Sequence, residues 1–326
     1  MKEISVLHKV QRTPAGTFFV CLPRAWAEQH GLKKGVAVAI TEASDGKLII
    51  DPGCAAESSP RVAALKPGPN LGREILGCYL RGFDVIRVEA KERVDFEVRN
   101  IVRRTVEQLI GLEIVEDDCL RIVLNCLLEP SGLHPEKILR RNYTIVADMH
   151  RDAVNSIIDG DVELAKNVIA RDVESNKLYF LLVRVLRTII QNSSLREKLG
   201  VSPIECLDYQ LVASLVEAIG DACVRMALKT VELEDAKISE ELKKLLVELH
   251  TLCFLAHENA IKAFLNHDIT LAQEVHNTRE KIEKTLANIE KATQAQKRLE
   301  LSHKSLAATS FIHQIYEHSV DISNLV

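Results

Sequence analysis

Apolar residues recur at helical spacing along residues 209–229 and 311–326, which predicts an amphipathic helix in each stretch. Each helix carries an acidic pair with a spacing of four residues, Glu217 with Asp221 and Glu317 with Asp321. Carboxylates at this spacing lie side by side and repel each other, so each pair is locally unfavourable without a cation. The recurrence of the pair indicates a candidate cation site.

A solvated helix face would give the same acidic pattern. The apolar stripe expected for the first helix comprises Leu211, Leu215, Ile219, Ala222 and Met226. At 100° per residue, the two carboxylates of this helix fall on the opposite side of that stripe. Spacing alone therefore leaves both interpretations open, a bound cation and simple exposure to water.

The chain after residue 135 consists of long amphipathic helices with short breaks. Residues 159–165 (DGDVELA) are similar to residues 266–272 (NHDITLA) at an offset of 107, whereas the acidic pairs recur at an offset of 100. A difference of seven residues is about two helical turns, which an antiparallel helix pair can lose without changing its inward face. The pattern predicts two three-helix repeats, with helices at 136–159, 162–198 and 203–234, then at 238–266, 269–300 and 302–326.

The first 53 residues predict a small β unit. Strands are expected over 4–11 and from 17 to Pro23, a short helix over 25–32, and a hairpin of 36–42 with 47–51 around Asp45-Gly46. Four short strands and one helical turn provide little core for a monomer, so we expect this unit to dimerise.

The middle of the chain divides into a linker and a small α+β module. Residues 54–71 are rich in Ala, Ser, Pro and Gly and predict a linker without helix or strand. Within residues 72–130, stretches with helical periodicity alternate with stretches with strand periodicity, which predicts the α+β module. Its expected helices lie at 74–81 and 95–110, and its expected strands at 84–90, 112–116 and 120–128.

Charge restricts the partners of the chain. The formal net charge of −4 excludes a globally basic nucleic-acid binder, but residues 1–36 hold six Lys or Arg against two acidic residues. Such a local excess could contact phosphates.

The eight cysteines form no CxxC motif and mostly lie in apolar runs, which is typical of buried thiols in a reducing cytoplasm. No signal-peptide core and no run of 18 apolar residues is found. We therefore expect a cytoplasmic protein without membrane insertion.

Residues 9–40 resemble the AbrB/MazE/SpoVT swapped-hairpin family. The matching features are Gly16 in a loop, Leu22-Pro23 at a strand end, Gly31-Leu32 after a short helix, and Lys34-Gly35. The resemblance implies an interlocked homodimer. Many members of this family contact DNA with basic residues. On matching positions it nominates Lys9, Arg12 and Arg24 for DNA contacts. Ala27 and Glu28 depart from it, because DNA-binding members often carry arginines in the short helix.

Residues 135–326 resemble the PhoU family through the hairpin at 159–178 and the two acidic motifs. The resemblance implies twin three-helix bundles that bind metal at acidic surface motifs and regulate phosphate uptake. The second acidic motif of the family corresponds here to Asp172 with Asn176, and to Arg279 with Glu283. Hard cations need several carboxylate oxygens, so these replacements favour a single weakly bound ion, or none, over a multinuclear cluster. Asp172 and Glu283 complete the expected ligand set, for an ion of the iron, zinc or magnesium class.

An enzyme is disfavoured. A di-iron oxidase built in a helical bundle needs two Glu-x-x-His pairs, and the only such spacing here joins Glu300 to His303. No other catalytic constellation can be assigned from residue order.

The predicted fold class is mixed. It combines a swapped-hairpin β domain (1–53), a linker (54–71), an α+β module (72–130) and an all-α PhoU-like bundle of two three-helix repeats (135–235 and 236–326). This combination resembles the archaeal phosphate uptake regulators. It implies a DNA-binding transcriptional regulator whose bundle senses phosphate status. The alternative is an adaptor that docks a phosphate transporter or sensor kinase and uses its N-terminal domain only to dimerise.

Overall fold

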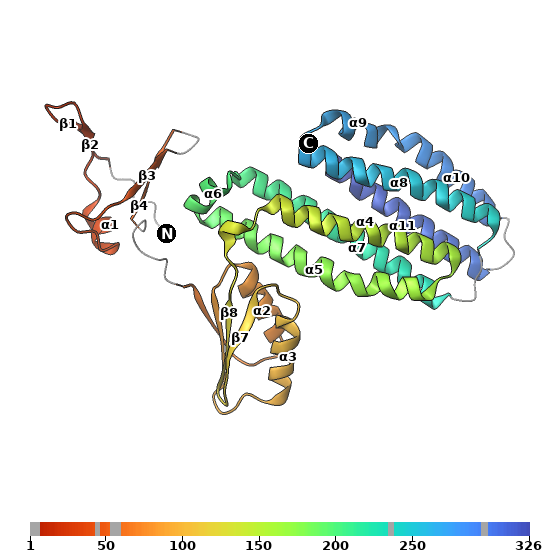
Figure 1. The fold of residues 1–326 in the computed structure, drawn as a ribbon, viewed down its shortest axis with the longest axis horizontal. Coiled ribbons are helices and arrows are strands. Elements are labelled where there is room, and N and C mark those ends of the chain that lie inside the picture. The colour runs from red at the N-terminus through yellow and green to blue at the C-terminus, as the bar shows by residue number, and fades with distance from the viewer. Residues whose placement is uncertain (1–6, 43–45, 53–59, 234–237, 295–298) are drawn as a thin grey trace. The chain divides into compact units, whose positions relative to one another are not determined.

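The computed structural model describes residues 7–42, 46–52, 60–233, 238–294 and 299–326, with side chains from residue 304 onward in the last segment. The chain forms two compact units, residues 1–60 and residues 61–326. Figure 1 shows the second unit as an α+β domain joined to a bundle of long helices. In the described residues, no helix is long and apolar enough to cross a bilayer.

The N-terminal unit contains two separate β-hairpins and one short helix. Strand β1 (Gln11–Arg12) pairs antiparallel with β2 (Phe18–Phe19), and β3 (Ala39–Glu42) pairs antiparallel with β4 (Leu48–Asp51). Helix α1 spans Arg24–Gln29. The order of elements agrees with the sequence pattern, although β1 and β2 are shorter than expected. The turn at Asp45 lies outside the described residues.

The described residues of this N-terminal unit include none that is buried. Its large apolar side chains face solvent in the single chain, with exposed fractions of 67% for Phe18, 62% for Ile40 and 69% for Leu48. A chain segment without buried apolar surface lacks the main favourable term of folding. The described residues of this unit therefore contain no buried core of their own.

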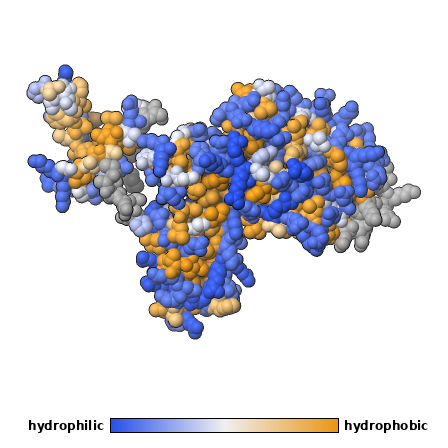
Figure 2. Space-filling model, viewed as in Figure 1, coloured by the Kyte–Doolittle hydropathy of each residue, from blue (hydrophilic) through white to orange (hydrophobic). Residues whose placement is uncertain are grey.

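The α+β domain is a four-stranded sheet in the order β5-β6-β8-β7, covered by two helices. Its elements are β5 (Val62–Leu65), α2 (Leu71–Leu80), β6 (Val85–Glu89), α3 (Phe96–Val106), β7 (Leu112–Asp117) and β8 (Arg121–Cys126). Strand β5 runs parallel to β6, and the other pairings are antiparallel. Buried Ile86 and Val88 alternate with exposed Arg87 and Glu89, so one sheet face packs against the helices. Figure 2 shows hydrophobic and hydrophilic residues side by side on the visible face of this domain.

Strand β5 lies inside residues 54–71, where the sequence predicted only a linker. The error has a physical reason: two of its four residues are alanines, which have low β propensity, and Pro67-Gly-Pro follows one residue after its end. The strand forms because β6 offers a parallel partner, which local sequence does not reveal.

The helical bundle consists of eight helices in the described residues, following the short 3₁₀ helix η1 (Pro130–Gly132). They are α4 (Pro135–Asp159), α5 (Val162–Gln191), α6 (Ser193–Leu199), α7 (Pro203–Glu232), α8 (Glu240–Asn266), α9 (Ile269–Asn277), α10 (Arg279–Gln294) and α11 (Leu299–Ser323). Helices α4, α5 and α7 form the first repeat, and α8 to α11 form the second. The repeats meet where α7 packs on α11 and α4 on α8, and one continuous core runs through both.

Both repeats begin their second helix in the same way. Asp161 accepts a hydrogen bond from the backbone N–H of Leu164 to cap α5, and Asp268 accepts one from that of Leu271 to cap α9. The two middle helices predicted as continuous are interrupted at Asn192 and Thr278. Asn192 caps α6 by accepting a hydrogen bond from the N–H of Leu195, so it starts a new helix.

The cysteines differ partly from expectation. Cys78, Cys206, Cys223 and Cys253 are buried as expected, but Cys21 and Cys119 are exposed. Both exposed cysteines lie outside the helices and strands, and Cys54 falls outside the described residues.

The helix ends that precede the two capping aspartates generate a stability prediction. Gly160 ends α4 with φ +73°, and the equivalent residue after α8 is His267, with φ +51°. A side chain in this left-handed region costs about 1 kcal/mol relative to glycine. His267→Gly should therefore raise the free energy of unfolding by about 0.5–1 kcal/mol in urea denaturation.

Two matched variants accompany this measurement. Gly160→Ala should lower stability by about 1–2 kcal/mol, because it introduces the same strain at the first helix end. His267→Ala keeps the strain and should give no gain. A loss of stability in His267→Gly would show that the imidazole makes a contact worth more than the strain.

Candidate functional site

Three carboxylates of the first repeat gather along the seam between α5 and α7, and we refer to Asp172, Glu217 and Asp221 as the acidic seam. Asp172 lies in the middle of α5, and the other two lie one turn apart on α7, which packs along α5. All three side chains are half-buried. The seam is therefore neither a fully solvated face nor a buried core.

The carboxylates of the acidic seam repel one another. Burial and then the charge of Asp221 raise the pKa of Asp172, while a hydrogen bond from Asn176 Nδ2, at 2.8 Å, acts in the opposite direction. Burial, and then Asp221 and Asp172, raise the pKa of Glu217. Raised carboxylate pKa values from neighbouring like charges are what a cation would relieve.

The cation nearest to the seam among the described contacts is Arg225, one turn after Asp221 on α7. Its guanidinium lies 3.9 Å from Asp221 Oδ2. Its positive charge also opposes, without cancelling, the rise in the pKa of Glu217. Arg225 also donates a hydrogen bond of 3.2 Å to Gln314 Oε1 on α11, in the second repeat. The arginine is thus shared between the seam and the neighbouring repeat and neutralises the seam only in part.

The equivalent position in the second repeat has a different chemistry. Arg279, where the first repeat has Asp172, places its guanidinium 3.5 Å from Glu317 Oε1. His313 Nε2 lies 3.3 Å from the same carboxylate oxygen. Asp321 lies 4.0 Å from His318 Nδ1, and Glu283 is exposed. Glu317 therefore already has a cation of the chain itself as its partner.

The residues fit a metal ion unequally in the two repeats. The acidic seam supplies three carboxylates, the donors that hard cations prefer. The second repeat supplies Glu317 beside a guanidinium that cannot lose its proton, so it does not fit a cluster. In the described part of the chain, no group of three or more ligating side chains already surrounds a common point. An ion at the seam would have to draw its carboxylates together.

Two expectations about α7 need correction: the residues of its apolar stripe, and the position of its carboxylates opposite that stripe. Leu211, predicted for the apolar stripe, is 51% exposed, whereas Val212 and Val216 are fully buried. The buried face is shifted toward Val212 and Val216 because α4, α5 and α11 all pack on this helix, and the sequence period alone predicts one contact face. The same shift brings Glu217 toward α5 and half-buries it.

Sequence reasoning missed Arg225 and its link to Gln314. The signal that could have found the arginine is its position four residues after Asp221, the spacing of a helical ion pair. The link to α11 requires knowledge of how the repeats pack. The Glu300 to His303 spacing, considered for a di-iron site, lies where side chains are outside the described residues.

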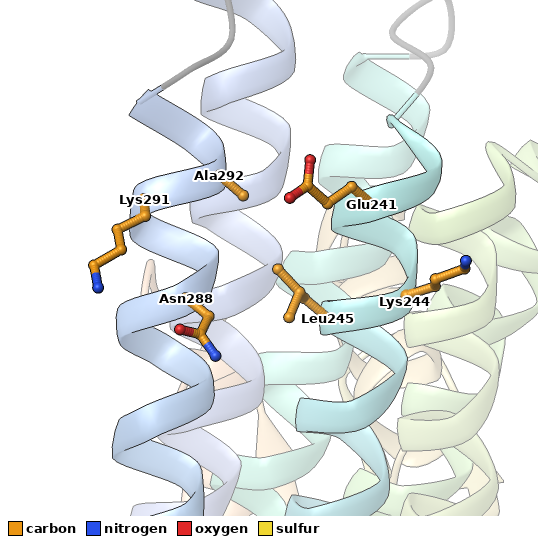
Figure 3. A pocket seen from close by; sticks show the side chains of 6 residues that line it. All are labelled: Glu241, Lys244, Leu245, Asn288, Lys291 and Ala292. Atoms are coloured by element: carbon orange, nitrogen blue, oxygen red, sulfur yellow. The ribbon is translucent and has the colours of Figure 1, made fainter.

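A groove between α8 and α10 is separate from these carboxylates. It has a volume of about 680 Å³ and is lined by Glu241, Lys244, Leu245, Asn288, Lys291 and Ala292. Figure 3 shows Glu241 directed into the gap between the helices, and the two lysines pointing away from each other. With one carboxylate and no converging charges, this groove is not a candidate cation site.

The three basic residues nominated for DNA contacts lie in the N-terminal unit with different surroundings. Lys9 is exposed. The guanidinium of Arg12 lies 5.4 Å from the centroid of the Phe18 ring, across the β1–β2 turn. Arg24 at the start of α1 pairs with Glu28, with 2.7 Å between Nε and Oε1, and both side chains are largely exposed.

Comparison with known proteins places the helical region. Residues 139–230 match the model of the PhoU domain. The chain is similar in structure to PhoU from Pseudomonas aeruginosa, with a TM-score of 0.52 and 18% sequence identity over 59% of this chain and 92% of that protein.

It is also similar to the phosphate transport system regulatory protein PhoU from Streptococcus pneumoniae. That match has a TM-score of 0.50 and 16% identity over 59% of this chain and 90% of that protein. Comparison with curated protein sequences found no match. The segment that matches the PhoU domain, residues 139–230, covers most of α4, α5 and α7, which include the acidic seam. Residues 139–230 therefore form a PhoU domain, and the helical part of the chain shares the fold of PhoU proteins.

Proposed function

We propose that this protein regulates phosphate transport, and that its first helical repeat senses a cation-linked signal through the acidic seam. The observation that carries the proposal is the electrostatic asymmetry between the repeats. Asp172, Glu217 and Asp221 repel one another in the first repeat, whereas Arg279 neutralises Glu317 in the second. The proteins of similar fold are PhoU proteins, one of them described as a phosphate transport system regulatory protein.

In this proposal the seam holds a single ion of the iron, zinc or magnesium class. Such an ion would neutralise the repelling carboxylates and hold α5 and α7 together more strongly than the apo seam does. Asp172, Glu217 and Asp221 would be its ligands. Arg225 would compete with the ion, because its guanidinium lies near Asp221. The role is regulatory rather than enzymatic.

At the other end of the chain, we propose that the N-terminal unit dimerises and contacts DNA. The unit has no buried residue among those described, and it carries six basic residues against two acidic ones within positions 1–36. A dimer would cover the exposed apolar side chains and double the local positive charge. A binding free energy at the seam could then bias DNA affinity through the linked domains.

A second candidate function is an adaptor that dimerises without binding DNA and docks a phosphate transporter or sensor protein. One observation favours it: Arg24 is already paired with Glu28, which reduces the positive charge available at the start of α1. The pair is exposed, and exposed pairs contribute only about 0–1 kcal/mol, so a phosphate could displace the glutamate. DNA binding remains the better-supported proposal.

The seam predicts one ion per chain. Titration of chelator-treated protein with Mn²⁺, an ion that carboxylates suit better than imidazoles do, should give a stoichiometry of one in a calorimeter. Glu217→Gln should abolish this binding, because it removes a charged donor of the seam. The matched variant Glu317→Gln should leave it unchanged, because Arg279 already neutralises that carboxylate.

The reverse change tests the asymmetry itself. Arg279→Asp recreates in the second repeat the acidic set of the first, and it should raise the stoichiometry from one toward two. Two ions in the unchanged protein, or loss of the ion in Glu317→Gln, would contradict the assignment. Circular dichroism should show the same helix content in all variants.

The DNA proposal predicts salt-dependent binding. Replacement of Arg12 and Arg24 by Ala should weaken binding to DNA from a phosphate-transport promoter. It should also reduce the slope of log K against log salt by about 0.9 for each phosphate that the variant no longer neutralises. Arg104→Ala, an exposed arginine of the α+β domain, is the matched control. Equal binding to a scrambled duplex of the same length would favour the adaptor instead.

The dimer proposal predicts that the exposed apolar side chains of the N-terminal unit form an interface. Ile40→Asp should shift the protein from dimer to monomer in light scattering with size exclusion, because a dimer would bury that charge. Val115→Asp places the same charge on a residue of the α+β domain that is 51% exposed, and should leave the mass unchanged. A monomeric unchanged protein would refute this interface.

A further inference from the structure

Three histidines that the proposed function does not use meet where α4 of the first repeat packs on α8 of the second. They are His150 on α4, and His250 and His257 on α8. His150 lies between the other two, with ring centroids 4.8 Å from His250 and 6.0 Å from His257. We refer to these three side chains as the histidine cluster.

The cluster leaves buried ring nitrogens without partners. His150 is fully buried and His257 is 1% exposed. Neither nitrogen of His257, nor Nδ1 of His150, has a hydrogen-bond partner among the described atoms. Leaving a buried polar group unsatisfied costs about 1–3 kcal/mol, so three such nitrogens in one place need an explanation.

The contact between His150 and His250 has the dimensions of two ligands on one tetrahedral ion. His250 Nδ1 and His150 Nε2 are 3.3 Å apart, long for an N–H···N hydrogen bond. Two imidazole nitrogens bound to Zn²⁺ at about 2.05 Å with tetrahedral angles also lie about 3.3 Å apart. The two rings are nearly perpendicular, with an interplanar angle of 85°.

The surroundings keep the imidazoles neutral, as metal binding requires. Burial lowers the pKa of His257 to about 4, and burial with the charge of Arg151 lowers that of His250 to about 4. Arg151 lies over the Phe254 ring and is paired with Asp148 at 3.0 Å, so its charge is partly compensated. No proton has to leave these rings near neutral pH for an ion to bind.

We infer that His150, His250 and His257 form a second, nitrogen-lined binding site for a borderline transition-metal ion of the Zn²⁺ class, which links the two repeats. Imidazole suits Zn²⁺ and Co²⁺ better than it suits Mg²⁺, so of the ion classes considered for the acidic seam, zinc and iron would also fit this site and magnesium would not. His150 and His250 are already placed as two ligands. His257 has to turn toward them, since the three rings now lie in a row and the described residues contain no preformed three-ligand group.

Access to the site runs past His250. This side chain is only partly buried, whereas the other two are enclosed by α4 and α8. An ion would therefore meet His250 first and reach His150 3.3 Å away. Once bound, it would hold α4 to α8 and so join one repeat to the other.

Cobalt tests the proposal, because its visible spectrum separates the two kinds of site. Chelator-treated full-length protein titrated with Co²⁺ should develop the intense visible bands of a four- or five-coordinate nitrogen site. A carboxylate and water site of six-coordinate Co²⁺ gives only weak bands. His250→Ala should remove the intense bands, and His257→Phe should remove or weaken them, whereas His8→Ala, a histidine of the N-terminal unit, should leave them unchanged.

A combined Glu217→Gln and Asp221→Asn variant separates this site from the acidic seam. It should keep the intense bands even if it loses the ion of the seam, so failure of one site does not imply failure of the other. In this double variant Zn²⁺ should also raise the melting temperature, and addition of His250→Ala should remove that increase. Weak bands only, or intense bands that survive in His250→Ala, would overturn the proposal.

Discussion

Helix α5 belongs to two hydrophobic cores at once, and a buried guanidinium fixes this arrangement. Arg184 on α5 donates a hydrogen bond of 2.6 Å to the backbone oxygen of Tyr79 on α2, and its guanidinium lies 4.9 Å from the Tyr79 ring centroid. No ion pair to Arg184 occurs among the described residues. Burying a charge is costly unless its donors are satisfied, so a shift of α2 away from α5 would be expensive.

The consequence is that the α+β domain and the first repeat share a rigid element. Phe180 of α5 packs against the core of the α+β domain, and Arg61 donates a hydrogen bond of 2.5 Å to Gln191 at the end of the helix. Asp172 lies about three turns before Arg184 on the same helix. The acidic seam and the contacts to the α+β domain therefore lie on one continuous helix.

The two repeats of the bundle resemble each other more closely in shape than in charge. Both repeats keep the capping aspartate, the acidic pair and the inward apolar face. Where the first repeat has Asp172, however, the second has Arg279 against Glu317. The guanidinium of Arg279 keeps its charge and lies beside Glu317, so the two motifs differ in local charge although they share a fold.

Much of this fold follows from sequence pattern, because helical periodicity is a local signal. The helices of the bundle begin and end close to the expected residues, since Gly160, Asp161 and Pro203 mark their ends chemically. Strand β5 was not predictable, because its partner β6 is remote in sequence and its own residues have low strand propensity. The acidic residues could be nominated one by one.

Their grouping into one seam, and the pairing of Arg279 with Glu317, depend on packing between helices. The histidine cluster shows the same limit, since 100 residues separate His150 from His250 and no short motif joins them. Spacing within one helix is readable from a sequence, whereas the register between two helices is set by the whole core.

The two ends of the chain differ in how they obtain their stability. Residues 61–326 contain two buried cores of their own, but the N-terminal unit has no buried residue among those described. A unit that gains its core only by association has a stability that depends on protein concentration. In the proposed dimer, the surface of this unit that would contact phosphates would therefore form only on assembly.

The charge distribution of the chain relates the proposed DNA contact to the acidic seam. The chain as a whole has a net charge of −4 although its first 36 residues are basic, so the remaining residues are strongly acidic and would be repelled by a nucleic acid. A cation held by Asp172, Glu217 and Asp221 would reduce that repulsion as well as the strain within the bundle. In the proposed function this effect would be strongest close to the seam, because salt screens charges that are more than about 10 Å apart.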